Sequence, residues 1–222
     1  MLATTTAGGG FTVWSLFAAS ADVFTGLLVV GSLVAVGLII RFAIEIREPV
    51  IAPPAASKKI NELIERGRAD EMARALRGDE TMVARTVRAA AEASPRGRAA
   101  MRAAAESEAG VIAGGLFRKI ELLNVIGNLG PLIGLAGTVW GMIIAFTSLG
   151  MAGGEAGPTE LALGISKALF HTLLGLVLAI PCLFVFGLYR SMVDRICTRA
   201  MAEASGFVER LPAGEAPGGG PA

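Results

Sequence analysis

The chain has few of the residues on which most enzymes and metalloproteins rely for their chemistry. Its 222 residues include a single histidine, His171, and two cysteines, Cys182 and Cys197. There is no Gly-rich phosphate-binding loop of the Walker type, and no set of His, Cys and carboxylate residues at metal-ligand spacing. We therefore expect no enzyme activity, no cofactor and no metal site. We also expect no disulfide, since one cysteine falls in an apolar run and the other in the tail that follows it.

Charge is missing from long stretches of the chain. Residues 122–154 carry no acidic or basic side chain, and residues 168–189 carry none besides His171. Hydrophobic residues make up 53% of the chain, against roughly 45–50% in ordinary soluble domains. An apolar helix of about 20 residues crosses a hydrocarbon core of about 30 Å. The sequence therefore predicts a membrane protein with three transmembrane helices, at residues 23–41, 122–149 and 167–189.

Lysine and arginine are absent from residues 1–40 and 150–166, whereas residues 41–121 carry fifteen of the 20. By the positive-inside rule, the N-terminus is then outside and the C-terminus cytoplasmic. Twelve acidic residues nearly balance the basic ones in the cytoplasmic region, which argues against a nucleic-acid partner. The first span has no basic segment before it and is longer than the core of a signal peptide, so we expect a retained anchor in the lipid bilayer.

Turn signals divide the cytoplasmic region. Short helices are predicted to end at Gly67, Gly78 and Ser94-Pro95, and one long helix is predicted to run from about residue 97 into the second span. The expected fold class is all-α, with a cytoplasmic helical domain formed by the loop after the first span and by extensions of the second and third. The predicted segments are an external segment (1–22) containing a surface helix with Phe11, Trp14 and Phe17, a transmembrane helix (23–41), the cytoplasmic domain (42–121), a second transmembrane helix (122–149), an external loop (150–166), a third transmembrane helix (167–189), a cytoplasmic helix (190–211) and a disordered tail (212–222).

Glycines recur in the second span at alternating spacings of three and four, which places them on one helical face. An interior glycine weakens a soluble helix by about 1 kcal/mol relative to alanine, but in lipid small residues let two helices approach closely. The third span carries a matching stripe of small residues, so the two spans are predicted to pack against each other. The two sets are Gly127, Gly130, Gly134, Gly137 and Gly141 in the second span, and Gly164, Ala168, Thr172, Gly175 and Ala179 in the third.

Each of these two helices carries one hydroxyl group at its packing face. Thr138 borders the glycines of the second span, and Thr172 lies within the stripe of the third. Threonine in a membrane helix commonly bonds a carbonyl one turn earlier, or serves simply as a small residue. The alternative is a role in an ion pathway, and the residues by themselves leave both interpretations open.

Two segments carry a resemblance to a known family: NVIGNLGPLIGLAGTVWGMIIAF at 124–146 and GISKALFHTLLGLVLAIP at 164–181. Together they resemble the paired-helix signature of the MotA/TolQ/ExbB proton channel family, in particular its ExbB/TolQ branch. The resemblance implies a homo-oligomeric ring, a pentamer in the family, whose second and third helices line a pore in the inner membrane. It also implies that Thr138 and Thr172 line the ion pathway.

The resemblance further implies partners. A dimer of a single-span ExbD/TolR-like protein would sit in the pore and supply a membrane aspartate, and proton flow would drive work on a TonB/TolA-like protein that crosses the periplasm. An ionisable group inside a membrane is functional by default, yet the second and third spans of this chain contain no carboxylate. The chain is therefore expected to borrow its proton carrier from that partner.

The sequence departs from the family pattern near the start of the third span. Lys167 stands where ExbB and TolQ have a glutamate, five residues before the threonine, and His171 follows one turn later on the same face. We consider both as possible residues of the pathway or of its outer mouth. Lys167 lies about 35 Å of helix from Arg190, so it can reach the outer interface. We expect His171 to be a neutral, hydrogen-bonded interface residue rather than a proton relay.

Two other functions remain as alternatives. A MotA-type flagellar stator subunit usually has four spans. A small-solute transporter would be expected to show an internal repeat and interrupted helices at its binding site. The sequence shows no internal repeat, and Pro131 is the only candidate break within the second span.

Overall fold

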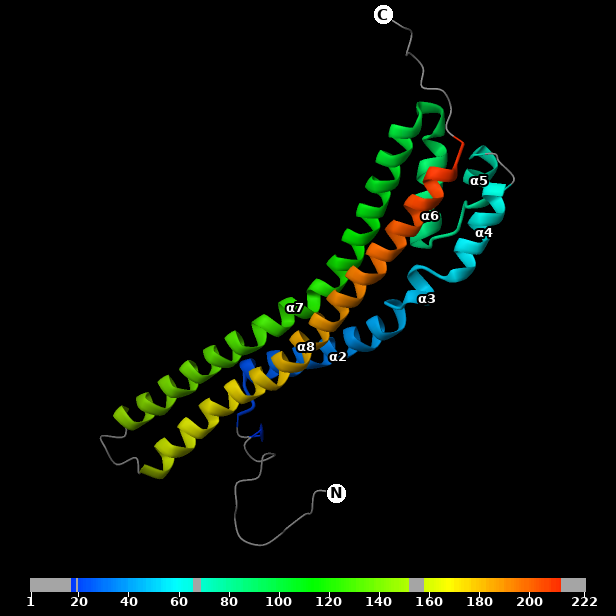
Figure 1. Cartoon of the computed structure of the whole chain (residues 1–222). Coiled ribbons are helices and arrows are strands. Elements are labelled where there is room, and N and C mark those ends of the chain that lie inside the picture. The colour runs from blue at the N-terminus through cyan, green and yellow to red at the C-terminus, as the bar shows by residue number, and fades with distance from the viewer. Residues whose placement is uncertain (1–16, 19, 66–68, 152–157, 213–222) are drawn as a thin grey trace, which may run out of the picture. The chain divides into compact units, whose positions relative to one another are not determined.

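The computed structural model describes residues 17–18, 20–65, 69–151 and 158–212, and this part of the chain is formed by helices and the turns between them (Figure 1). Three of the helices are long and apolar enough to cross a membrane, namely α2, α7 and α8. This confirms the all-α membrane fold class that the hydrophobic runs predict. The elements are α2 (Val23–Glu45), α3 (Glu48–Ile51), α4 (Pro54–Glu65), α5 (Ala69–Ala75), α6 (Met82–Glu92), the 3₁₀ helix η1 (Ser94–Arg96), α7 (Arg98–Met151) and α8 (Pro158–Arg210).

The chain divides into two compact units, to which α2, α7 and α8 each contribute a part. Unit 1 consists of residues 1–39 and 123–185, and it contains the apolar stretches of the three long helices. Many of its large apolar side chains are exposed, for example Leu33, Leu132 and Ile180. An apolar surface of this extent is typical of helices that face lipid or other subunits.

Unit 2 consists of residues 40–122 and 186–222 and contains a core of buried apolar side chains. Helices α4, α5 and α6 contact one another. Ion pairs on its surface join Arg85 to Glu108 at 2.6 Å and Arg102 to Glu209 at 2.7 Å. Its fully buried side chains include Ile60, Met72, Leu76, Val83, Val87 and Met101.

The turns of unit 2 lie at the predicted breaks. Gly78 and Gly97 have φ angles of 85° and 89°, a conformation that glycine adopts without steric cost. The η1 turn separates α6 from α7 at Ser94-Pro95. Beyond it, α7 runs from Arg98 to Met151 as one helix, which confirms the predicted long helix. Pro131 lies inside α7 and does not end it.

Some predictions concern residues outside the described part of the chain. Phe11 and Trp14 of the predicted surface helix lie there, as do Gly67, residues 152–157 of the predicted external loop, and all but Pro212 of the predicted disordered tail. Of the surface helix, Phe17 is described, and its ring meets that of Phe170 edge to face at 6.4 Å.

Candidate functional site

Helices α7 and α8 meet in unit 1 along a seam of small residues. A Cβ atom added to Gly130 would lie 2.9 Å from the carbonyl oxygen of Gly175, and one added to Gly175 would lie 2.5 Å from the carbonyl oxygen of Gly130. Because both distances are shorter than side-chain carbons tolerate, backbone rests directly on backbone here. Only glycine fits at these two positions without moving a helix.

The remaining small residues extend this seam in both directions, and their order makes the two helices antiparallel in unit 1. Ala179 is buried at 3% exposure. The facing residues are Gly127 with Cys182 and Leu183, Gly134 with His171 and Thr172, Gly137 with His171, Gly141 with Ala168, and Ala145 with Gly164.

One side of the α7–α8 pair carries an apolar groove that contains both predicted pathway residues. Thr138 and Thr172 line this groove, together with Thr147. The groove has a volume of about 810 Å³. Its apolar lining comes from Leu135, Val139, Met142, Ile143, Phe146, Ala168 and Leu169. We call it the threonine groove.

The hydroxyl groups of Thr138 and Thr172 are held differently. Thr138 donates a hydrogen bond of 2.7 Å to the carbonyl oxygen of Leu135 in its own helix. Thr172 Oγ1 lies 3.5 Å from the carbonyl oxygen of Gly134 across the seam, a long contact for a hydroxyl donor. The Thr172 hydroxyl is therefore the more available of the two for a new hydrogen-bond partner.

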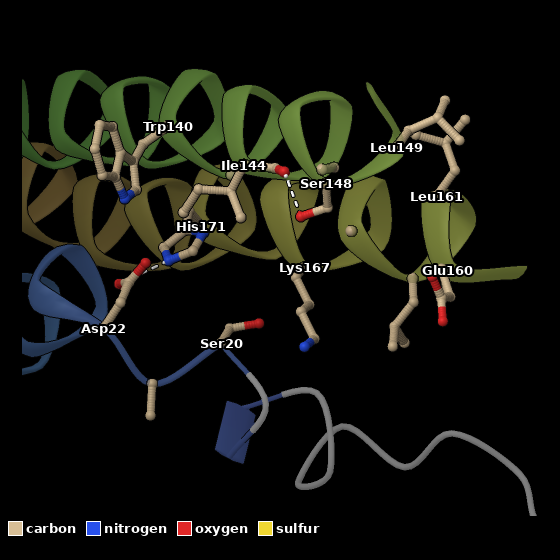
Figure 2. Close-up of a pocket in the computed structure, with 15 residues that line it drawn as sticks. Ser20, Asp22, Trp140, Ile144, Ser148, Leu149, Glu160, Leu161, Lys167 and His171 are labelled. Carbon is tan, nitrogen blue, oxygen red and sulfur yellow. Dashed lines mark hydrogen bonds and ion pairs between the residues drawn. The ribbon is translucent and has the colours of Figure 1, made fainter. Parts of the chain in front are cut away.

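A second cavity, of about 410 Å³, lies on a different side of the α7–α8 pair, and we call it the histidine pocket. Its polar lining includes Ser20 and Asp22 from the segment before α2, and Glu160, Lys167 and His171 from α8. Figure 2 shows Lys167 and His171 projecting from α8 on the side where the chain before α2 passes. The pocket shares no lining residue with the threonine groove.

Asp22 connects the start of α2 to α8. Its Oδ1 accepts a hydrogen bond of 2.9 Å from the backbone N–H of Thr25, the usual contact of an N-cap aspartate. The same Oδ1 lies 2.9 Å from Nε2 of His171 (Figure 2). Burial opposes ionisation of Asp22, but the hydrogen bonds from Thr25 and His171 outweigh burial and hold the pKa of Asp22 below its ordinary value. An ionised carboxylate only accepts hydrogen bonds, so Nε2 of His171 is the donor.

The His171 ring is enclosed by three elements. It fills the space above Gly137, where an added Cβ would lie 2.8 Å from the ring's Cγ. The ring of Phe24 meets it edge to face at 6.3 Å. His171 is 2% exposed, and its Nδ1 has no hydrogen-bond partner within the described part of the chain. Neighbouring residues of a helix point about 100° apart, so His171 does not share the groove of Thr172.

A comparison with known protein families shows which family the chain belongs to. The family model for the MotA/TolQ/ExbB proton channel family matches residues 57–201, which is more than half of the sequence. The chain belongs to this proton channel family. The match includes α5, α6 and α7 and most of α4 and α8.

Several curated ExbB proteins are similar to part of this chain. The biopolymer transport protein ExbB of Helicobacter pylori is 39% identical over 71 residues, which is 32% of this chain and 48% of that protein. The exbB1 protein of Vibrio cholerae is 37% identical over 76 residues, 34% of this chain and 33% of that protein. An ExbB homologue of Methanothermobacter thermautotrophicus is 29% identical over 144 residues, 65% of this chain and 50% of that protein. The aligned part therefore spans between a third and a half of each of these relatives.

Sequence reasoning missed Asp22, which lines the histidine pocket. Aspartate directly before an apolar run is a recognisable N-cap signal, so its place at the start of α2 could have been predicted. Its contact with His171 joins residues 149 positions apart, and no local pattern reports such a pair. Lys167 lines the histidine pocket rather than the threonine groove.

Proposed function

We propose that this chain is an ExbB/TolQ-like subunit of a motor complex driven by the proton-motive force in an inner membrane. Copies of the chain would form a ring, a pentamer, with the threonine groove facing its centre. A single-span ExbD/TolR-like partner would occupy the ring and contribute a membrane aspartate. Proton flow through the assembly would drive transport or other work across the envelope through a TonB/TolA-like protein.

The observation that carries this proposal is the threonine groove itself. It combines an apolar lining with threonine hydroxyls, and the Thr172 hydroxyl has only a long contact to Gly134. A carboxylate at mid-membrane depth is costly unless it finds hydrogen-bond donors. The groove offers such donors, while the second and third spans offer no carboxylate of their own. This division supports a chain that serves a carboxylate held by a partner.

We place the N-terminus and the loop between α7 and α8 outside, with unit 2 in the cytoplasm. The support is the distribution of basic residues, fifteen of which lie in residues 41–121. The continuity of α7 and α8 weighs against a small-solute transporter, because transporter sites are commonly built from interrupted helices.

The test is proton flux in liposomes. The purified chain alone should show little proton flux, and co-reconstitution with the single-span partner should produce it. The matched control replaces the membrane aspartate of the partner by asparagine and should return flux to the level of the chain alone. Selective proton flux through the chain without any partner would refute the borrowed carboxylate.

A further inference from the structure

His171 is the single histidine of the chain, and the proposed pathway in the threonine groove does not use it. It is almost fully buried, and only Nε2 is paired, with Asp22. Its other nitrogen, Nδ1, is buried without a hydrogen-bond partner in the described residues. His171 therefore combines a titratable ring, a position beside a cavity, and one ring nitrogen without a partner in the described residues. These features suggest a role besides packing.

Charged groups of both signs line the pocket beside the ring. Asp22 faces it from the segment before α2, and Lys167 and Glu160 line the same pocket from α8. The polar groups that α7 adds to the pocket, on Trp140 and Ser148, are uncharged. With His171 neutral, two carboxylates face one ammonium group, which leaves one net negative charge. Uptake of one proton makes the pocket neutral, and charges interact more strongly in a low-dielectric site than in water.

The two partners differ in access to water. The side chain of His171 is 3% exposed, whereas that of Asp22 is 35% exposed. Gly137 and Phe24 hold the ring from α7 and α2, so the ring has little room to move within unit 1. A structural change on protonation is therefore expected at Asp22, where the chain enters α2, rather than at the ring.

We propose that Asp22 and His171 form a proton-binding clasp, in which a proton taken up from the water that reaches Asp22 fastens the start of α2 to α8. In the neutral form, Nε2 donates one hydrogen bond to the carboxylate. In the protonated form the same contact joins opposite charges, so a coulombic attraction is added to the hydrogen bond. The clasp goes beyond the proposed function, because it needs neither a ring nor a partner.

The first test measures the protonation state of the ring directly. Full-length protein without a histidine tag, labelled with ¹⁵N-histidine in lipid bilayers, gives the signals of one imidazole. The clasp requires a neutral ring with its proton on Nε2 at alkaline pH and a doubly protonated ring at acidic pH, and spectra recorded from about pH 8 to pH 5 cover the interval in which histidine side chains commonly change charge. Asp22→Asn should move this conversion to more acidic pH, and Glu160→Gln, a matched carboxylate of the same pocket, should move it less.

Two results of this experiment would overturn the proposal. One is a wild-type ring that stays neutral across the whole range. The other is a conversion that Asp22→Asn leaves where it is. Neither result bears on the partner-dependent flux of the proposed function, so the two proposals fail independently.

The second test measures the fastening of α2. Ser20 is 4% exposed and lies at the start of this segment, so a Ser20→Cys thiol reports its release through labelling by a membrane-impermeant maleimide. The same variant in a His171→Gln background corrects for the pH dependence of the thiol, because glutamine can donate to Asp22 but does not titrate. Relative to this reference, labelling should rise severalfold from pH 6 to pH 8, and an unchanged ratio would contradict the clasp.

Discussion

The hydroxyl of Thr172 has only a long contact of 3.5 Å with the carbonyl oxygen of Gly134, while Thr138 is already engaged at 2.7 Å with Leu135. We therefore predict that Thr172→Val, which keeps the shape but removes the hydroxyl, leaves the complex assembled and abolishes energy transduction. Thr138→Val should have a milder effect. Partner-dependent activity in cells, measured beside recovery of the complex, checks both variants.

A matched control for these substitutions lies in unit 2. Thr86 is buried and its hydroxyl has no hydrogen-bond partner among the described residues. Thr86→Val makes the same chemical change without removing a hydrogen bond, so transduction should persist. An active Thr172→Val variant would return Thr172 to a packing role.

At the scale of single residues, the sequence predicts residues that recur at helical spacing. It does not predict contacts between residues far apart in the chain. The glycine face could be predicted because its period of three and four is written locally in residues 127–141. The contact between Asp22 and His171 could not, because it depends on how two helices meet in space. The difference between the hydroxyl contacts of Thr138 and Thr172 likewise depends on distances across the seam, which helical periodicity does not predict.

At the scale of helices, the seam between α7 and α8 sets a graded response to added side-chain volume. Gly130→Ala and Gly175→Ala place a methyl group against the backbone of the facing helix, which cannot yield. We predict that each destabilises the protein by about 1–3 kcal/mol, the typical cost of overpacking. Gly127→Ala should cost less, because its clash is with the flexible side chain of Leu183. Thermal unfolding in mild detergent measures the series.

The control for the seam is a glycine in open space. A Cβ added to Gly37 in α2 would have no other atom within 4 Å, and alanine favours a helix over glycine by about 1 kcal/mol. Gly37→Ala should therefore leave stability unchanged or raise it. Equal losses for Gly37→Ala and Gly130→Ala would contradict this prediction, because Gly37 has no facing backbone for a methyl group to clash with.

The helices themselves could be predicted from the sequence because their ends carry local signals. Gly78, Gly97 and Ser94-Pro95 mark turns through backbone preferences that act within a few residues. The absence of a strong breaker after Gly97 likewise predicts the length of α7, and α7 tolerates Pro131. Helix length in such a chain follows from local chemistry. The partner of a helical face could be predicted for α7 and α8, whose small residues recur at matching spacing, but not for the contact of α2 with His171.

At the scale of the whole molecule, the chain separates two kinds of surface. Unit 1 exposes large apolar side chains, while unit 2 buries its apolar residues and forms ion pairs such as Arg85 with Glu108. Fifteen of the 20 basic residues lie in residues 41–121, and four more follow Tyr189. Positive charge is retained on the cytoplasmic side during membrane insertion. The apolar residues thus determine which segments enter the membrane, and the basic residues determine which way the chain is oriented in it.

This orientation gives the last prediction. A reporter that is active only outside the cytoplasm should be active when inserted within residues 150–160 and silent when inserted near residue 70. A reporter active only in the cytoplasm should give the reverse pattern, and it controls for misfolded fusions. The reason is that residues 150–166 and 1–40 lack lysine and arginine altogether, so nothing in them opposes translocation. The three-span topology places one span between the two sites. If both insertions report the same side, the chain crosses the membrane an even number of times between them or not at all, and this topology is wrong.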